Sequence, residues 1–184
     1  MRIIKPYNIF EELRKPVIYF GKIQQKIRMF EDFLGECTIN PDGTVDVVGD
    51  VDLSARCGGR YGIILKFGKV SGNFNCSGNR VFDLRGCPSY VGGNFDCAGN
   101  ILESLEGAPM EVGGDFNCSG NELSSLQGCP IEVGGNFDCS INLRLTQLDT
   151  VASIGGDIIC ARTNINPKKN GFNGWCGGEI KYIK

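Results

Sequence analysis

The sequence contains no histidine, no pair of cysteines in a C-x-x-C arrangement and no long hydrophobic run. The missing histidine removes the commonest acid–base group of enzymes, and the missing cysteine pair removes the usual spacing of a zinc site. Dinucleotide-binding and phosphate-binding glycine motifs are absent too. A membrane-spanning helix needs about 18 apolar residues in a row, and neither such a run nor the layout of a signal peptide is present. We therefore expect a chain that is not an enzyme, with no metal, no cofactor and no membrane contact.

A repeat occupies much of the chain instead. The segment V-G-G-N-F-D-C-A-G-N at residues 91–100 recurs every 21 residues, with close copies from residues 70, 112 and 133 and a divergent copy from residue 154. Repeats of this length are typical of solenoids, because a single unit cannot bury its own apolar face and must stack on its neighbours. The length of 184 residues suits one domain.

Each unit predicts a short strand with one buried face. In the step F-x-C, apolar residues alternate with polar ones, which is the period of a strand. The Asn three residues after each Cys is expected to bond backbone groups where the chain leaves the strand. The Gly pair before the strand is expected to permit a tight turn or a positive φ. The expected inward and turn columns are Phe74, Phe95, Phe116, Phe137 and Ile158; Cys76, Cys97, Cys118, Cys139 and Cys160; Leu102, Leu105, Leu123 and Leu126; and Asn79, Asn100, Asn121 and Asn142.

The motif F-x-C-x-x-N-x-L-x-x-L resembles the core of leucine-rich repeats, with Phe and Cys in the two strand positions. The 21-residue period and the Gly-x-Pro step that closes a unit are similar to the short bacterial members of that family. This resemblance covers roughly residues 45–165. It implies a right-handed α+β solenoid of about six coils, with short parallel strands on a concave face and irregular coils behind. The repeat motif V-G-G-x-F-x-C-S-x-N also resembles that of small, functionally unassigned repeat proteins of large tailed bacteriophages.

The segments on either side of the repeats predict caps. Residues 1–36 are expected to form an N-terminal helical cap, with one helix over residues 9–14 and a second that Gly35 ends. The second helix is predicted by an apolar stripe at helical spacing, Ile23, Ile27, Phe30 and Leu34. The alternative interpretation is a helix presented to a partner.

Two further segments join these caps to the repeats. The turn sequence N-P-D-G at residues 40–43 predicts a β-hairpin that leads into a degenerate first coil, where Val51 and Leu53 take the Phe and Cys positions. Residues 37–165 would then be the solenoid, and residues 166–184 a small C-terminal cap in which Phe172 and Trp175 cover the final coil.

The ten cysteines are predicted to be reduced structural thiols. Five of them share one inward column, where a small apolar side chain is wanted. Cys87 and Cys129 share a repeat position with Ala108, which again indicates a small buried side chain. Reduced thiols imply a reducing cytoplasm, which would be the bacterial host cytoplasm if the chain is phage-encoded.

The charge is segregated along the chain. Residues 70–160 carry 3 basic and 11 acidic residues, a net charge of −8, whereas residues 161–184 carry 5 basic and 1 acidic residue, a net charge of +4. An acidic repeat block disfavours direct nucleic-acid binding. It is explained either by solubility or by a partner protein with a basic surface.

We therefore expect a non-catalytic protein-binding module, and the phage resemblance implies a phage protein that binds a host protein such as a defence component. The alternatives are a structural or virion-associated scaffold and an acidic mimic of nucleic acid. The expected partner surface is the outward side of the strands: Asn94, Asp96, Asp115, Asn117, Asn136, Asp138 and Asp157, with Phe172 and Trp175 as the alternative. The sequence predicts neither the partner's identity nor the oligomeric state.

Overall fold

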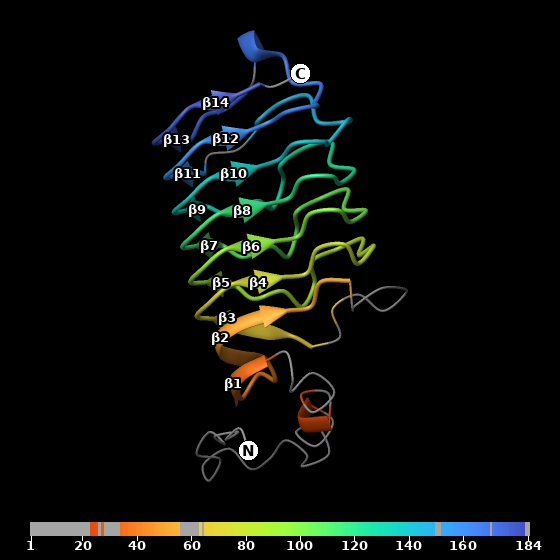
Figure 1. Ribbon diagram of the computed structural model, residues 1–184, viewed down its shortest axis with the longest axis vertical. Coiled ribbons are helices and arrows are strands. Elements are labelled where there is room, and N and C mark those ends of the chain that lie inside the picture. The colour runs from red at the N-terminus through yellow and green to blue at the C-terminus, as the bar shows by residue number, and fades with distance from the viewer. Residues whose placement is uncertain are drawn as a thin grey trace.

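The computed structural model describes residues 23–25, 27, 34–55, 63, 65–149, 152–169 and 171–182. This described part of the chain is a parallel β-solenoid of about six turns with almost no helix. The coils are stacked one above another along the long axis of the molecule (Figure 1). The predicted solenoid is therefore confirmed, but the leucine-rich-repeat architecture is not.

Each 21-residue coil contains two short strands in place of the one that the F-x-C step predicts. The first strand ends at the Val before the Gly pair, and the second begins at the Phe after it. The first strands form the odd-strand sheet: β3 (Phe67–Val70), β5 (Tyr90–Val91), β7 (Glu111–Val112), β9 (Glu132–Val133), β11 (Ser153–Ile154) and β13 (Trp175–Cys176). The second strands form the even-strand sheet: β4 (Phe74–Asn75), β6 (Phe95–Asp96), β8 (Phe116–Asn117), β10 (Phe137–Asp138), β12 (Ile158–Ile159) and β14 (Ile180–Lys181).

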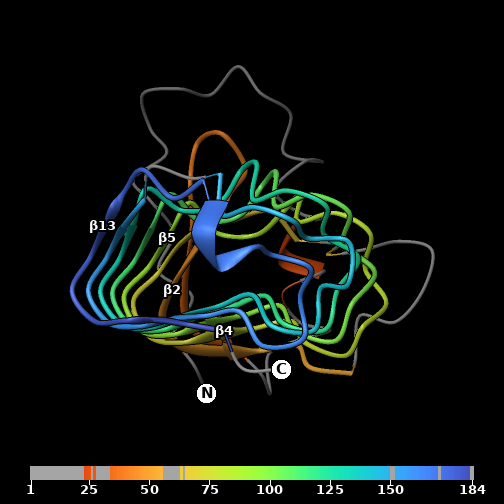
Figure 2. The same cartoon turned by 90° about the horizontal axis from the view of Figure 1, so that it is seen from above.

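The two sheets are halves of one continuous hydrogen-bonded sheet that bends at a corner, and they share one strand. The long strand β2 (Val45–Asp52) pairs in parallel with both β3 and β4. Seen along the stack, the odd and even strands lie on two different sides of the coil, with irregular chain on the remaining side (Figure 2). The solenoid thus presents two sheet faces to the outside instead of a single concave one.

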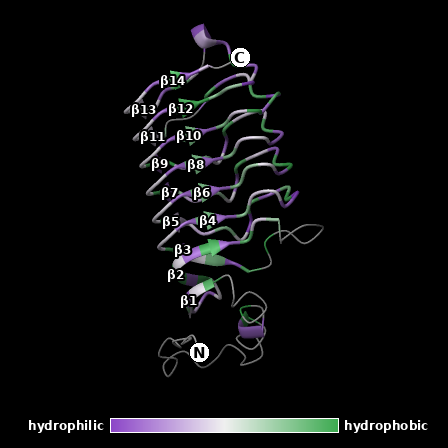
Figure 3. Cartoon of the chain, viewed as in Figure 1, coloured by the Kyte–Doolittle hydropathy of each residue, from purple (hydrophilic) through white to green (hydrophobic). Residues whose placement is uncertain are grey.

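Aromatic and thiol side chains fill the interior in the predicted columns. The rings of Phe74, Phe95, Phe116 and Phe137 stack nearly parallel, with successive centroids 5.6, 5.3 and 5.1 Å apart. The Cys column from Cys76 to Cys160 is buried beside them. Figure 3 shows apolar positions recurring at equivalent places in successive coils. Stacking of identical side chains thus gives each coil the same core as its neighbour.

The Gly pair is required by close packing between coils, and not by a positive φ. No pair glycine from Gly92 to Gly156 has a positive φ. A Cβ on Gly92 would lie 2.3 Å from the Ser71 carbonyl oxygen, and one on Gly93 would lie 2.4 Å from Asn73 Oδ1. The coils approach so closely at this corner that only hydrogen fits. The expectation of a positive φ holds instead for the Gly-x-Pro step, where Gly86, Gly107 and Gly128 have φ of 102°, 91° and 83°.

The start of the solenoid agrees with the prediction in part. Strand β1 (Leu34–Ile39) pairs antiparallel with β2 around the predicted hairpin turn, and Val51 pairs with Phe74 as expected of a degenerate first coil. Residues 23–25 and 27 are helical, and Ile23 and Ile27 are buried in the core. Leu34, however, belongs to β1, and Gly35 lies within that strand and does not end a helix.

The predicted helical cap is therefore not confirmed as one apolar helix face. The hairpin requires Leu34 for its own register, where it pairs with Val51. Phe30 and the predicted helix over residues 9–14 lie outside the described residues.

The C-terminal segment adds strands to both sheets. Strands β13 and β14 continue the two ladders. A short 3-10 turn, η2 (Pro167–Lys169), precedes them. Phe172 packs against the core as predicted, whereas Trp175 is 60% exposed and does not cover the final coil. Trp175 is in register with Ser153 on the odd-strand sheet, and this outward position keeps its ring in solvent.

Candidate functional site

The seven predicted surface residues lie in two separate columns. Four of them stand at the corner between the two sheets, immediately before the second strand: Asn94, Asp115, Asn136 and Asp157. Three of them point outward from the even-strand sheet: Asp96, Asn117 and Asp138. The sequence predicted one surface for all seven residues because its pattern predicts only one strand per coil.

The corner column is a hydrogen-bond ladder between coils. In each coil the side-chain Oδ1 accepts the backbone N–H of the corner residue one coil further on. Asn94 Oδ1 accepts from Asp115 at 2.8 Å, Asp115 Oδ1 from Asn136 at 2.7 Å, and Asn136 Oδ1 from Asp157 at 2.9 Å. Asn and Asp alternate freely here because both provide this oxygen. The column's first role is structural.

The even-strand column stabilises the turn that follows each strand. Asp96 Oδ1 accepts the N–H of Ala98 at 2.9 Å, and Asp138 Oδ1 accepts that of Ser140 at 2.8 Å. Asn117 makes the same bond to Ser119 at 3.0 Å. These are side-chain turns two residues long, which Asn and Asp favour.

Carboxylates in the even-strand column are kept apart by amides. Asn117 stands in register between Asp96 and Asp138. Burial raises the pKa of the Asp96 carboxyl, and the charge of Asp138 raises it further, while the hydrogen bond from Ala98 opposes both effects. Repulsion between the carboxylates of this column therefore acts across two coils, from Asp138 to Asp96.

The acidic columns end at a lysine. Lys181 Nζ lies 2.5 Å from Asp157 Oδ2, and the hydrogen bond from Lys181 lowers the pKa of the Asp157 carboxyl. Asp157 also accepts the N–H of Glu179 through Oδ1. Both of its oxygens are thus engaged, which makes Asp157 the least available of the predicted partner-binding residues.

The odd-strand sheet carries outward residues that lie outside the predicted partner surface. Tyr90, Glu111, Glu132, Ser153 and Trp175 lie in register on neighbouring strands. Met110 and Ile131 directly precede Glu111 and Glu132 and are 59% and 54% exposed. The occurrence of Met110 and Ile131 at the same repeat position was the signal that could have revealed this surface. Because the sequence predicted only one strand per coil, this position was expected to lie in a loop.

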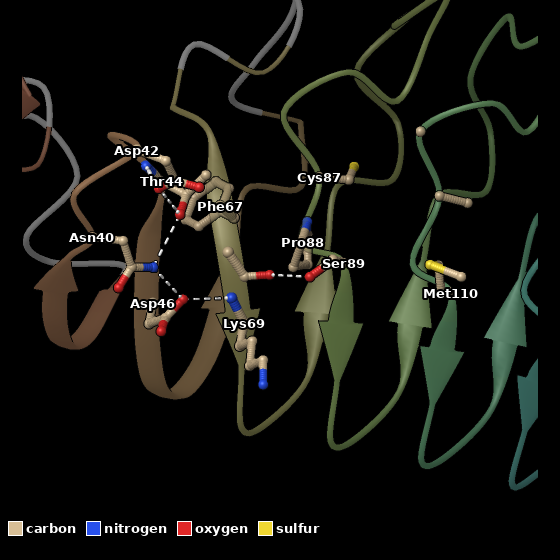
Figure 4. A pocket seen from close by; sticks show the side chains of 13 residues that line it. Asn40, Asp42, Thr44, Asp46, Phe67, Lys69, Cys87, Pro88, Ser89 and Met110 are labelled. Carbon is tan, nitrogen blue, oxygen red and sulfur yellow. Dashed lines mark hydrogen bonds between the residues drawn. The ribbon is translucent and has the colours of Figure 1, made fainter.

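A depression of about 520 Å³ lies at the beginning of this sheet (Figure 4). Its polar end contains Asn40, whose Nδ2 donates to Thr44 Oγ1 and to Asp46 Oδ1, both at 2.9 Å. Asp46 Oδ1 also accepts the backbone N–H of Lys69 at 2.8 Å. Met110 lies at its apolar end. The polar groups bond mainly to one another, so the depression offers little hydrogen-bonding capacity to a small molecule.

The thiols are suited to packing rather than to chemistry. The nine described cysteines are thiols, and seven of them are buried. Burial raises the pKa of the Cys97 and Cys118 thiols well above the ordinary value, and raises that of Cys160 to about 11. A nucleophilic or metal-binding cysteine needs the thiolate. Among the described residues, no group of three or more Cys, Asp or Glu side chains is placed to hold a metal ion.

Comparisons with known proteins add no relative. No protein-family model matches the chain, and no match was found among curated proteins or among solved structures. Within the described part of the chain, no helix is both long and apolar enough to cross a membrane.

Proposed function

We propose that the chain is a non-catalytic protein-binding module whose sheet faces contact a partner with a basic surface. The observation that carries this proposal is the pair of flat sheet faces on an acidic, continuously hydrogen-bonded stack. Repeat solenoids use such extended surfaces to bind other proteins. The net charge of −8 over residues 70–160 favours a basic partner and speeds its association.

The resemblance to repeat proteins of tailed bacteriophages suggests where to look for that partner. On this proposal, the partner is a protein of the bacterial host, such as a defence component, and the module acts by occupying its surface. A leucine-rich-repeat ancestry would be compatible with the repeat motif, although two strands per coil make it a divergent one.

The test is capture of host proteins by the immobilised full chain at increasing salt concentration. A specific basic partner should be retained at low salt and released at high salt, because screening weakens exposed charge pairs. The triple variant Asp96→Asn, Asp115→Asn and Asp138→Asn should keep the fold, since Asn already fills both columns in neighbouring coils. Asp157 is left unchanged because its bond to Lys181 joins the last two coils.

A matched variant removes the same number of charges from another side of the coil. Glu103, Glu106 and Glu122 are exposed and lie in the segments that follow the even strands. Their replacement by Gln should leave partner binding nearly unchanged if the sheet faces make the contact. Retention of no protein by the wild-type chain, or only of intact virions, would contradict the proposed function.

A further inference from the structure

The odd-strand sheet carries a continuous row of five outward side chains. Backbone pairing brings Tyr90, Glu111, Glu132, Ser153 and Trp175 into register on five successive strands. Strands in a sheet lie about 4.8 Å apart, so the row extends for about 19 Å. Two carboxylates stand side by side within this row, Trp175 stands at one end, and Tyr90 at the other end is in register with the exposed Lys69 of the preceding strand.

The two glutamates form an unusual pair for a stable sheet. Glu111 and Glu132 are exposed and directly in register, and like charges in that arrangement destabilise a sheet. No ion pair joins either of them to another described residue, whereas Glu103 and Glu122 both have Arg144 within reach. The even-strand column, by contrast, separates its carboxylates with amides. The odd-strand row therefore concentrates negative charge where the rest of the solenoid disperses it.

An apolar column runs beside the row. The Ile131 N–H donates to the Met110 carbonyl at 2.9 Å, which places the two exposed side chains on adjacent coils. Met110 also forms the apolar end of the depression at the beginning of the sheet (Figure 4). Together, the five-residue row and the column of Met110 and Ile131 make up what we call the odd-strand strip.

We propose that the odd-strand strip binds an extended, cationic segment of a partner protein, laid along the axis of the solenoid. Lysine or arginine side chains of that segment face Glu111 and Glu132, and its apolar side chains cover Met110 and Ile131. This inference rests on the proposed function and assigns it a face and a partner chemistry.

The dimensions and the chemistry of the strip fit this occupant. An extended chain advances about 3.3 Å per residue, so about six residues cover the row. The Trp175 ring attracts ammonium and guanidinium groups, which extends the preference for cations to that end of the row, whereas Lys69 beside Tyr90 opposes a cation at the other end. On the even-strand face, Asp96, Asn117 and Asp138 have short side chains whose Oδ1 atoms already bond to the backbone. Unlike the even-strand face, the odd-strand strip combines large exposed apolar groups with neighbouring carboxylates.

The single tryptophan gives a direct measurement. Trp175 is the only tryptophan of the chain and is 60% exposed. The probe is a synthetic peptide of alternating lysine and leucine, titrated into the full chain while the emission of Trp175 is recorded. We expect saturable binding with a blue shift of the emission. A peptide with glutamate in place of lysine should not bind, and an all-lysine peptide should bind more weakly.

Variants of the strip separate site-specific binding from general attraction to an acidic protein. Glu111→Gln with Glu132→Gln, and Met110→Ser with Ile131→Ser, should each weaken peptide binding about tenfold or more, which corresponds to about 1.4 kcal/mol. The matched controls are Asp96→Asn with Asp138→Asn for charge and Leu143→Ser, at a 63% exposed residue outside the strip, for apolar surface. They should change binding less than about twofold, a difference of about 0.4 kcal/mol.

The outcomes distinguish the strip from the wider proposal. Equal weakening of peptide binding by the even-strand variants would overturn the proposal that the odd-strand strip is the binding site. No change in Trp175 emission at saturation would also overturn it. Capture of a host protein that the strip variants retain undiminished would also overturn it while leaving a protein-binding module intact. Peptide binding at the strip without any captured host protein would support the strip and count against the proposed function. Cooperative thermal unfolding of each variant confirms that the fold is retained.

Discussion

Asn100 Oδ1 accepts the backbone N–H of Asn79, a residue 21 positions earlier, at 2.9 Å. The same oxygen accepts the N–H of Val81, and the Asn100 amide nitrogen donates to the carbonyl groups of Cys76 and Cys97. One buried side chain thus satisfies four backbone groups on two coils. These bonds explain why Asn, and not Asp, occupies this position in four successive coils, since a carboxylate cannot donate to the two carbonyls.

Replacing Asn100 by Ala should therefore destabilise the protein strongly. Four buried backbone groups would lose their partner, and we expect the free energy of unfolding to fall by about 3–5 kcal/mol. Urea unfolding followed by circular dichroism measures this change. The control is Asn117→Ala, which removes only the bond to Ser119 and should cost about 1 kcal/mol. Similar costs for the two variants would contradict the role of the buried amide.

Replacing Ile141 by Gly should stabilise the protein. Ile141 has a φ of 57°, in the column where Gly78, Gly99 and Gly120 have φ of 66°, 64° and 65°. A β-branched residue is strained in this region by about 1–2 kcal/mol, which exceeds the entropic cost of glycine. We expect a gain of about 0.5–1 kcal/mol, or a few degrees in Tm. Ile101 is similarly exposed but has no positive φ, so Ile101→Gly should instead lower Tm.

Replacing Asp96 by Asn should raise stability at neutral pH. Burial, with the charge of Asp138, raises the pKa of the Asp96 carboxyl above its unfolded value near 3.8. The contribution of the Asp96 carboxyl to stability is therefore fully present below the unfolded pKa, and it is lost as pH rises through the higher pKa of the folded state. An amide keeps the bond to Ala98 without the charge, and we expect Tm at pH 7 to rise on the order of 1–2 °C.

Replacing Asp157 by Asn, at the end of the corner column, should have the opposite effect on Tm. Lys181 lowers the pKa of the Asp157 carboxyl. Its contribution is present above the unfolded pKa and is lost as pH falls through the lower pKa of the folded state. Asp157→Asn should therefore reduce Tm at pH 7, and little at strongly acidic pH. If both substitutions shift Tm in the same direction at pH 7, the two carboxyls do not differ as described.

The buried thiols should make the protein sensitive to alkali. Burial raises the pKa of Cys97, Cys118 and Cys139 above the ordinary value of 9.0 and that of Cys160 to about 11. Stability is complete below the unfolded pKa and falls as pH rises above it, because only the unfolded chain releases these protons. Each such thiol adds a loss of about 1.4 kcal/mol per pH unit.

Urea unfolding in the presence of reductant, from pH 7 to pH 10.5, measures this loss. Cys97→Ala should lessen the slope above pH 9 by about 1.4 kcal/mol per pH unit. At pH 8 a thiol reagent should label the partly buried Cys129 and Cys176 first and the remaining described thiols only on denaturation. Stability that stays constant up to pH 10.5, or a native mass showing several disulfides, would contradict buried reduced thiols.

The sequence predicted which residues stack in columns better than it predicted the path of the chain within one coil. Phe95 and Cys97 are buried and Asn100 bonds between coils as expected, since a strict 21-residue period brings equivalent residues together whatever the coil's exact path. The period does not reveal how the chain bends within one unit. The strand before the Gly pair is only two residues long, with Glu111 outward and Val112 inward, which is too short for a detectable alternation.

The site was predicted less well for the same reason. Asp115 and Asp96 are both polar and outward, but only the bend between the sheets separates the corner position from the strand position. At the N-terminal end, Leu34 fitted a helical stripe, yet pairing with Val51 in the hairpin determines its structure. A long-range strand pairing of this kind leaves no signal in local periodicity.

The glycine pairs at the corner make the spacing between successive coils regular. Gly113 and Gly134 let each coil settle on the preceding one with the same close approach, 2.3 and 2.2 Å from a notional Cβ to the carbonyl oxygen below. The stacking step is therefore the same at every repeat, and gain or loss of a whole 21-residue unit leaves every column in alignment. Each added unit would lengthen both faces by about 4.8 Å without altering their chemistry. The length of the solenoid can thus change by duplication of units, independently of its surface chemistry. The surface chemistry can change by substitution of outward residues.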